Sequence, residues 1–262
     1  MRYRKGSLNL NNFQDKALLN FVVDARYVTH AQLFQFAQLD YYEDNRPSFN
    51  WRIRRMVEAG LVRKQALPML NGDALYSITR AGLQALERLG IYYLGATCDR
   101  EQDGYKFQMT HVLEVNNIRL ALLVHRKLLH WIPECFIRVL NLSPTTAYAK
   151  VYDGIANVMV DSDFVDVAVE YERTLKSPAK YEKIRKAIES EKRVKAFLYL
   201  VPSYQLLHGL MEAFGGTRQL VMFGLVEEFK REQLTTRVRD ANYGETSLHD
   251  ALAKLLPAKT GT

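Results

Sequence analysis

The chain has 262 residues, of which 48% are hydrophobic and 25% are charged. This is the composition of a globular protein with one large or two small domains, and it excludes a largely disordered or collagen-like chain. Lysine and arginine outnumber aspartate and glutamate by 36 to 29, and the formal net charge of +7 is compatible with a polyanionic partner such as nucleic acid.

The sequence carries no signal for a membrane or for an oxidising compartment. No apolar run approaches the ~20 residues that span a bilayer, and the basic residues 1–5 are not followed by the apolar stretch of a signal peptide. Cys98 and Cys135 have no histidine or cysteine neighbours at ligand spacing, which favours free thiols over a disulfide framework or a zinc finger. We therefore expect a cytoplasmic protein with no membrane partner.

Residues 1–94 are predicted to form a first domain of helices and one β-hairpin. Apolar positions at helical spacing predict helices at residues 13–23, 30–38, 49–59 and 80–89. Strands are expected at residues 61–67 and 74–78, around a turn at 71–73. The capping residues Thr29, Ser48 and Thr79 mark helix starts, and Gly60 and Gly90 mark helix ends.

The order of helix, helix, helix, hairpin and helix resembles a winged helix-turn-helix domain. In such a domain the second helix of the motif enters the major groove of DNA, and here that helix is residues 49–59. Between Arg46 and Lys64, six basic residues stand against one acid, Glu58, so the segment carries a net charge of +5. We therefore expect double-stranded DNA as a partner.

The expected DNA contacts are polar residues of this helix and of its flanking segments. They are Arg46, Asn50, Arg52, Arg54, Arg55, Arg63 and Lys64. Arginine pairs with guanine, asparagine pairs with adenine, and both side chains also bind phosphate. The alternative is a solvated basic face that contacts proteins. Trp51 is expected to pack inside the domain rather than to stack on a base.

A polar linker at residues 95–108 is predicted to precede a second domain, residues 109–262. Helices are expected at residues 111–129, 178–193 and 204–214, the last with Ser203 as its cap. Strands are expected at residues 136–140, within 148–160, at 164–172, at 194–201 and at 219–225, before a mixed polar tail. The fold class is therefore α+β or α/β, with a winged helix followed by a mixed α/β domain around a central sheet.

Acidic residues gather on two neighbouring strands of this sheet. Because side chains alternate along a strand, Asp166, Ala168, Glu170 and Glu172 share one face. Asp153 lies on the preceding strand, beside a glycine that lets the chain bend, and we expect it within a few ångströms of Glu170. Carboxylates at that separation repel unless a cation lies between them, and oxygen ligands suit Mg²⁺ or Mn²⁺. Such a metal activates water and neutralises charge in phosphoryl chemistry.

The whole pattern resembles the PD-(D/E)xK, or restriction-endonuclease-like, core, and the chain is similar to the bacterial replication-relaxation family of plasmids and mobile elements. The resemblance covers about residues 13–205. The matching residues are the run 111–116, Asp153-Gly154, the run 170–173, Lys176-Ser177 and Tyr181. Members of that family join an N-terminal winged helix to a nuclease-like domain.

The resemblance implies that Asp153 and Glu170 are metal ligands and that Glu114 is a third acid. Active members carry a lysine two residues after the second acid, and this chain has Glu172 there. Lys176 and Lys180 are the candidates to supply the missing positive charge, so the catalytic set is expected to be Asp153, Glu170, Glu172 and Lys176. The alternative is an inherited fold in which these acids only pair with nearby lysine and arginine.

We expect a DNA-binding protein of a mobile element or plasmid that acts in replication, mobilisation or their regulation. Its partners are then double-stranded DNA and replication or transfer proteins, and a homodimer is compatible with a winged helix. The first alternative is an endonuclease with Mg²⁺ or Mn²⁺ as cofactor; without that activity no cofactor is expected. The second alternative is a winged-helix transcriptional regulator.

Overall fold

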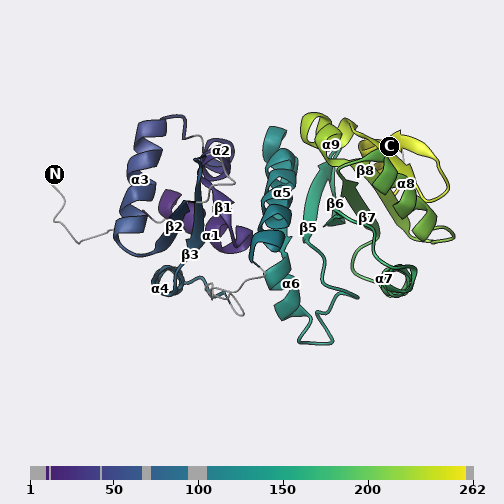
Figure 1. Cartoon of the computed structure of the whole chain (residues 1–262), viewed down its shortest axis with the longest axis horizontal. Helices are drawn as coiled ribbons and strands as arrows, with labels where there is room; N and C mark the ends of the chain where they lie inside the picture. Colours follow the sequence, from purple (N-terminus) through teal and green to yellow (C-terminus); the bar gives the residue numbers. More distant parts are fainter. Residues whose placement is uncertain (1–9, 12, 42, 67–71, 94–104, 258–262) are drawn as a thin grey trace. The chain divides into compact units, whose positions relative to one another are not determined.

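The computed structural model describes residues 10–11, 13–41, 43–66, 72–93 and 105–257 (Figure 1). The chain divides into two compact units between Asn116 and Asn117. Of the predicted linker, only residues 105–108 lie among the described residues, and they belong to helix α5 (Tyr105–Leu123). The first half of α5 thus belongs to the first unit, whereas the sequence assigned it mainly to the second domain. No helix in the described ranges is both long and apolar enough to cross a membrane.

The first unit is a winged helix-turn-helix domain, as predicted. Its elements are α1 (Gln14–Ala25), β1 (Val28–Thr29), α2 (His30–Tyr41), α3 (Arg46–Glu58), β2 (Val62–Ala66), β3 (Ala74–Ile78) and α4 (Arg80–Arg88). The three strands form an antiparallel sheet in the order β1-β3-β2. The helix-turn-helix motif is α2 and α3, and β2 with β3 forms the wing (Figure 1).

Local hydrogen bonds explain where these helices begin. Thr29 Oγ1 accepts from Gln32 N at 3.1 Å while Gln32 Oε1 accepts from Thr29 N at 3.2 Å, a reciprocal capping pair. Thr79 Oγ1 accepts from Gly82 N at 3.0 Å, as predicted for the cap of α4. The φ angle of +70° at Gly60 is a left-handed conformation that ends α3 at low cost.

The start of α3 differs from the prediction. Asn45, not Ser48, caps the helix: Asn45 Oδ1 accepts from Ser48 N at 3.0 Å. Pro47 then lies in the first turn, where its missing N–H has no intrahelical partner to lose. Both Asn45 and Ser48 are good capping residues, so the local sequence is compatible with a helix that begins after either of them. In the structure the helix begins after Asn45.

The second unit is built on a seven-stranded mixed sheet. After the end of α5 come β4 (Leu128–Pro133), α6 (Glu134–Leu140), β5 (Gly154–Val160), β6 (Asp163–Tyr171), α7 (Pro178–Ser190), β7 (Ala196–Val201), α8 (Tyr204–Ala213), β8 (Leu220–Leu225), α9 (Val226–Glu232), β9 (Arg237–Asp240), β10 (Glu245–Ser247) and α10 (Leu248–Ala253). The strand order is β10-β9-β8-β7-β6-β5-β4. Strands β6, β7 and β8 are parallel, and the other pairs are antiparallel.

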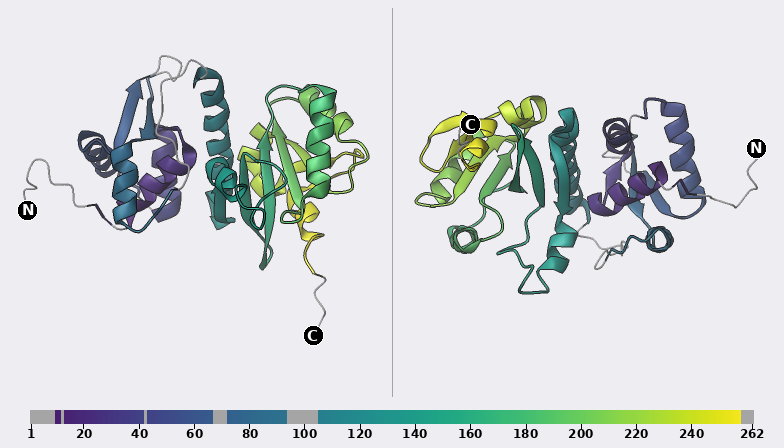
Figure 2. Two further views of the ribbon diagram at one scale, coloured as in Figure 1. Left: turned by 90° about the horizontal axis from the view of Figure 1, so that it is seen from below. Right: turned by 180° about the vertical axis from the view of Figure 1, so that it is seen from behind.

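Helices lie on both faces of this sheet, as Figure 2 shows. On one face, Ile118 and Leu122 of α5 pack with Phe229 of α9 and with valines of β6. On the other face, residues of α7 and α8 pack with Ala168, Phe197 and Tyr199. The result is a mixed α/β unit with a central sheet, in which α5 is followed by β4, α6, β5, β6, α7 and β7.

Three predicted elements of this unit were wrong. The predicted strand at residues 136–140 is helix α6, since a short apolar run fits either structure and Pro133 precedes it at the N-cap position. The predicted helix at 111–129 ends at Leu123, and β4 follows after a 3₁₀ turn with positive φ at Arg126. The tail after Leu225 is not irregular, because two further strands extend the sheet and two helices cover it.

Candidate functional site

The exposed face of α3 is the first candidate site. Phe49, Ile53 and Met56 are buried in the core of the first unit. Because residues three and four apart share a helix face, the opposite side presents Asn50, Trp51 and Arg54, all exposed. This is the geometry in which a recognition helix offers its side chains to the major groove.

Trp51 is part of this exposed face, contrary to the prediction that it packs inside the domain. Its side chain is 40% exposed, and the guanidinium carbon of Arg55 lies 4.4 Å from the centroid of its ring. Arginine over an indole ring is a favourable cation–π arrangement. The pair therefore adds an aromatic and a basic group to the same surface.

Further basic residues flank the helix. The guanidinium carbon of Arg46, in the first turn of α3, lies 5.2 Å from the ring centroid of Phe34. Arg63 and Lys64 are exposed on β2, the edge strand of the wing. We call the exposed residues of this face and its flanks, together with the half-buried Arg55, the recognition surface: Arg46, Asn50, Trp51, Arg54, Arg55, Arg63 and Lys64. Arg54 is only loosely paired there, with its Nε 4.0 Å from Glu58 Oε1.

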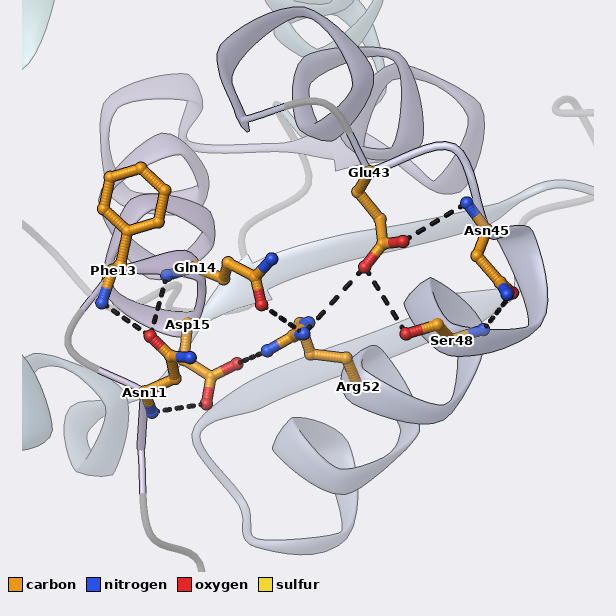
Figure 3. Close-up of polar contacts among 8 residues, drawn as sticks. All are labelled: Asn11, Phe13, Gln14, Asp15, Glu43, Asn45, Ser48 and Arg52. Atoms are coloured by element: carbon orange, nitrogen blue, oxygen red, sulfur yellow. Dashed lines mark hydrogen bonds and ion pairs between the residues drawn. The ribbon is translucent and has the colours of Figure 1, made fainter.

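Arg52 was predicted as a DNA contact, and the structure corrects this. Its side chain is only 13% exposed, and Nη1 lies 2.7 Å from Asp15 Oδ1 in α1 (Figure 3). Nη2 donates to Gln14 Oε1 at 2.5 Å and lies 3.9 Å from Glu43 Oε2. Arg52 therefore ties α3 to α1 and to the segment before α3, and it lies outside the recognition surface.

The acidic site lies in the second unit, where β5 begins and β6 ends. Gly154 of β5 pairs with Val169 of β6, which sets Asp153 opposite Glu170. Asp153 Oδ2 accepts a hydrogen bond from Tyr171 N at 2.8 Å. Glu170 is buried, and its side chain lies on the face of the sheet that packs against α7 and α8. The two predicted acids thus come from opposite positions at the ends of two neighbouring strands.

Lys150 is a member of this site that sequence reasoning missed. Its Nζ donates to Glu170 Oε1, while Nζ of Lys176, the predicted lysine, donates to Glu172 Oε2 instead. Burial raises the pKa of Glu170 to about 7, with the charge of Asp153 acting in the same direction and Lys150 acting against both. The only sequence signal for Lys150 was its place three residues before Asp153.

A buried tyrosine adjoins the acids. Tyr199 of β7 is the register neighbour of Glu170, is 1% exposed, and its hydroxyl has no hydrogen-bond partner among the described residues. Burial and the nearby carboxylates raise the pKa of Tyr199, so it stays a neutral donor. The site therefore contains a phenol, two close carboxylates and one ammonium group.

The donor set fits at most a two-carboxylate metal site. Mg²⁺ is often held by one or two carboxylates with water completing its shell, and Asp153 with Glu170 supplies such a pair. Glu172 turns to Lys176, and Glu114 lies in α5 within the first unit. Within the described ranges, no three Asp, Glu, His or Cys side chains come close enough to hold a metal ion.

Comparison with known proteins adds little. No protein-family model and no curated protein matches the chain. One similar solved structure is the restriction endonuclease FokI bound to DNA, with 11% sequence identity and a TM-score of 0.25. The match covers 82% of this chain and 43% of that chain, so this chain spans less than half of its length.

Proposed function

We propose that this protein binds double-stranded DNA sequence-specifically through its recognition surface. The observation that carries the proposal is the exposed polar and basic face of α3, with Asn50, Trp51 and Arg54 opposite a buried apolar face. Arginine and asparagine on such a helix read base edges, and the basic residues of the wing bind phosphates. The net charge of +5 between Arg46 and Lys64 supplies the attraction that does not depend on sequence.

The wider role that we propose is that of a cytoplasmic protein of a plasmid or mobile element, acting in replication, mobilisation or their regulation. This part rests on the family resemblance of the sequence. In this proposal the second unit assembles the protein with replication or transfer proteins, or positions it on DNA. Binding as a homodimer predicts a pseudo-palindromic site with half-sites about one helical turn apart.

The test is selection of bound duplexes from a random library by the full chain, followed by fluorescence anisotropy on the selected site. Arg54→Ala is expected to lower the affinity for that site by roughly 5–150-fold, the range of one good base contact. Arg88→Ala, an exposed arginine of α4, is the matched control and is expected to change affinity less than twofold. Equal affinity for all duplexes, or no effect of Arg54→Ala, would contradict the proposal.

A second candidate function is a metal-dependent DNA endonuclease. The observation that favours it is the pair of close carboxylates, Asp153 and Glu170, beside Lys150 and at the same strand ends as the motif that the sequence resembles. Asp153 and Glu170 would hold Mg²⁺ or Mn²⁺, which lowers the pKa of bound water and neutralises charge on a phosphate. Lys150 would balance the charge of Glu170, and Tyr199 would offer a buried proton donor.

Plasmid nicking separates the two candidates. The full chain is incubated with supercoiled DNA that contains the selected site, with Mg²⁺, with Mn²⁺ or with EDTA. An endonuclease predicts nicking that needs the metal and is lost in Asp153→Asn and Glu170→Gln while DNA affinity survives. Binding without nicking, unchanged by either substitution, supports the DNA-binding function alone.

A further inference from the structure

The unusual contact of the recognition surface is a histidine that joins it to the wing. His30, the first residue of α2, has Nδ1 3.0 Å from the hydroxyl oxygen of Tyr76 in β3 and Nε2 2.8 Å from Asn50 Oδ1 in α3. Its ring also meets the buried Phe49 edge-on, with 5.1 Å between ring centroids. The imidazole thus contacts β3 through Tyr76 and α3 through Asn50 and Phe49, and Asn50 belongs to the recognition surface.

The direction of these hydrogen bonds follows from the groups themselves. Asn50 Oδ1 only accepts, so His30 Nε2 carries the proton and donates to it. In a neutral imidazole Nδ1 then accepts, and Tyr76 supplies the proton. Burial raises the pKa of Tyr76 to about 12, which keeps its hydroxyl a donor at neutral pH. These hydrogen bonds therefore run from Tyr76 through His30 to Asn50, and they orient the amide of Asn50.

We propose that His30 is a positioning residue that sets the base preference of Asn50 by holding its Oδ1, so that Nδ2 is the group offered to DNA. This inference rests on the proposed DNA binding. A bidentate contact of asparagine with adenine needs Oδ1 as acceptor and Nδ2 as donor together. His30 fixes the amide plane of Asn50 through Oδ1, so the two Nδ2 protons are the donors turned to the groove. Such a donor favours an edge that presents acceptors alone over the adenine edge, where the N7 acceptor lies beside the N6 donor. Guanine N7 and O6 and thymine O4 are such acceptors in the major groove.

The experiment measures preference at one base position rather than overall affinity. That position is identified as the one whose selectivity disappears in Asn50→Ala. Wild-type protein is expected to favour guanine or thymine over adenine there by about tenfold, within the range of one base contact. His30→Ala is expected to cut that preference severalfold while affinity for unrelated duplex stays within twofold, because phosphate contacts are untouched.

Two further variants protect the test against a folding defect. Tyr76→Phe removes one oxygen and keeps the ring, and it is expected to reduce the preference in the same direction as His30→Ala. In an Asn50→Ala background, His30→Ala is expected to change nothing at that position, since the residue that it positions is gone. Gln35→Ala, an exposed change on α2, serves as the matched control with wild-type preference.

Each outcome bears on the inference. A wild-type preference for adenine at the Asn50 position would overturn it, as would a His30→Ala protein that loses affinity equally for all sequences. An effect of His30→Ala that persists in the Asn50→Ala background would also overturn it. If the wild-type chain bound no duplex at all, the proposed function itself would fail together with this inference.

Discussion

Arg52 and Arg54 are two residues apart in α3, yet they lie in opposite environments. Arg52 neutralises Asp15, whose side chain is only 4% exposed, whereas the Arg54 side chain is 65% exposed. Removing one partner of a buried ion pair leaves the other charge without compensation, which costs about 3–5 kcal/mol. We therefore expect Arg52→Ala to lower the free energy of unfolding by that amount in urea titrations.

Arg54→Ala is the matched control for this prediction, since an exposed surface change is usually within about 0.5 kcal/mol. A second control is Asp15→Asn with Arg52→Gln, which removes both charges and is expected to recover part of the loss. An Arg52→Ala protein that is as stable as wild type but binds DNA more weakly would instead support the prediction that Arg52 contacts DNA.

Glu170 predicts a pH dependence of stability. Its pKa in the folded protein is raised from 4.5 to about 7, so the folded protein binds more protons than the unfolded chain between these values. The free energy of unfolding therefore falls by about 3 kcal/mol, from this group alone, as pH rises from 4.5 to 7. Above pH 7 it levels off. Lys150 offsets part of the cost that burial imposes on the charged form.

The measurement is urea unfolding at pH 5 and at pH 8 in EDTA, for wild type, Glu170→Gln and Glu212→Gln. Glu170→Gln is expected to lose most of this decrease. Glu212, an exposed glutamate of α8, is the matched control and is expected to keep the wild-type profile. A Glu170→Gln protein with an unchanged pH profile would show that Glu170 titrates normally.

At the scale of elements, the N-terminus of α4 is joined to the end of α3 by one hydroxyl. Thr79 Oγ1 accepts from Gly82 N at 3.0 Å and donates to Gly60 O at 2.6 Å. Replacing a threonine cap by alanine costs about 0.5–2 kcal/mol. We expect Thr79→Ala to show this loss in thermal unfolding and Thr79→Ser to keep most of the stability. Equal losses in both variants would mean that the methyl group, not the cap, matters.

Gly154 starts β5 for a reason other than the bend that the sequence predicted. Its φ is not in the left-handed region, but a Cβ there would lie 2.0 Å from Cζ2 of Trp131 in β4. Gly154→Ala must displace this indole, and such overpacking costs about 1–3 kcal/mol. We expect a lower midpoint in urea, with partial recovery in the double variant Gly154→Ala/Trp131→Leu. No loss in the single variant would mean that the indole moves freely.

At the scale of the whole molecule, charge is concentrated rather than spread. The chain carries a net charge of +7, and the segment from Arg46 to Lys64 alone carries +5. Each phosphate contact adds about 0.9 to the slope of log affinity against log salt concentration. We therefore expect Arg63→Ala/Lys64→Ala to reduce that slope by about 2 in anisotropy titrations. The matched control is Arg80→Ala/Arg88→Ala, which removes two exposed arginines of α4. An equal reduction of the salt slope in this control would mean that DNA does not bind preferentially at the recognition surface.

Much of the architecture was readable from the sequence. The winged helix, the alternation along β6 that puts Glu170 on the face opposite Val169, and the caps at Thr29, Thr79 and Ser203 all agree with the prediction. The failures were α6 and β4, where short apolar runs fit helix and strand equally well, and the last two strands, β9 and β10, whose residues are mostly polar.

What the sequence by itself determined are features set within a few residues: helix caps, side-chain periodicity and the order of elements. What only the tertiary structure decided are partners between distant segments: Arg52 with Asp15, Lys150 with Glu170, and His30 with Asn50 and Tyr76. These partners lie 20 to 46 residues apart in the chain. Such pairs depend on how elements pack, because burial and the need of each buried polar group for a partner select among many candidates that are equal in sequence.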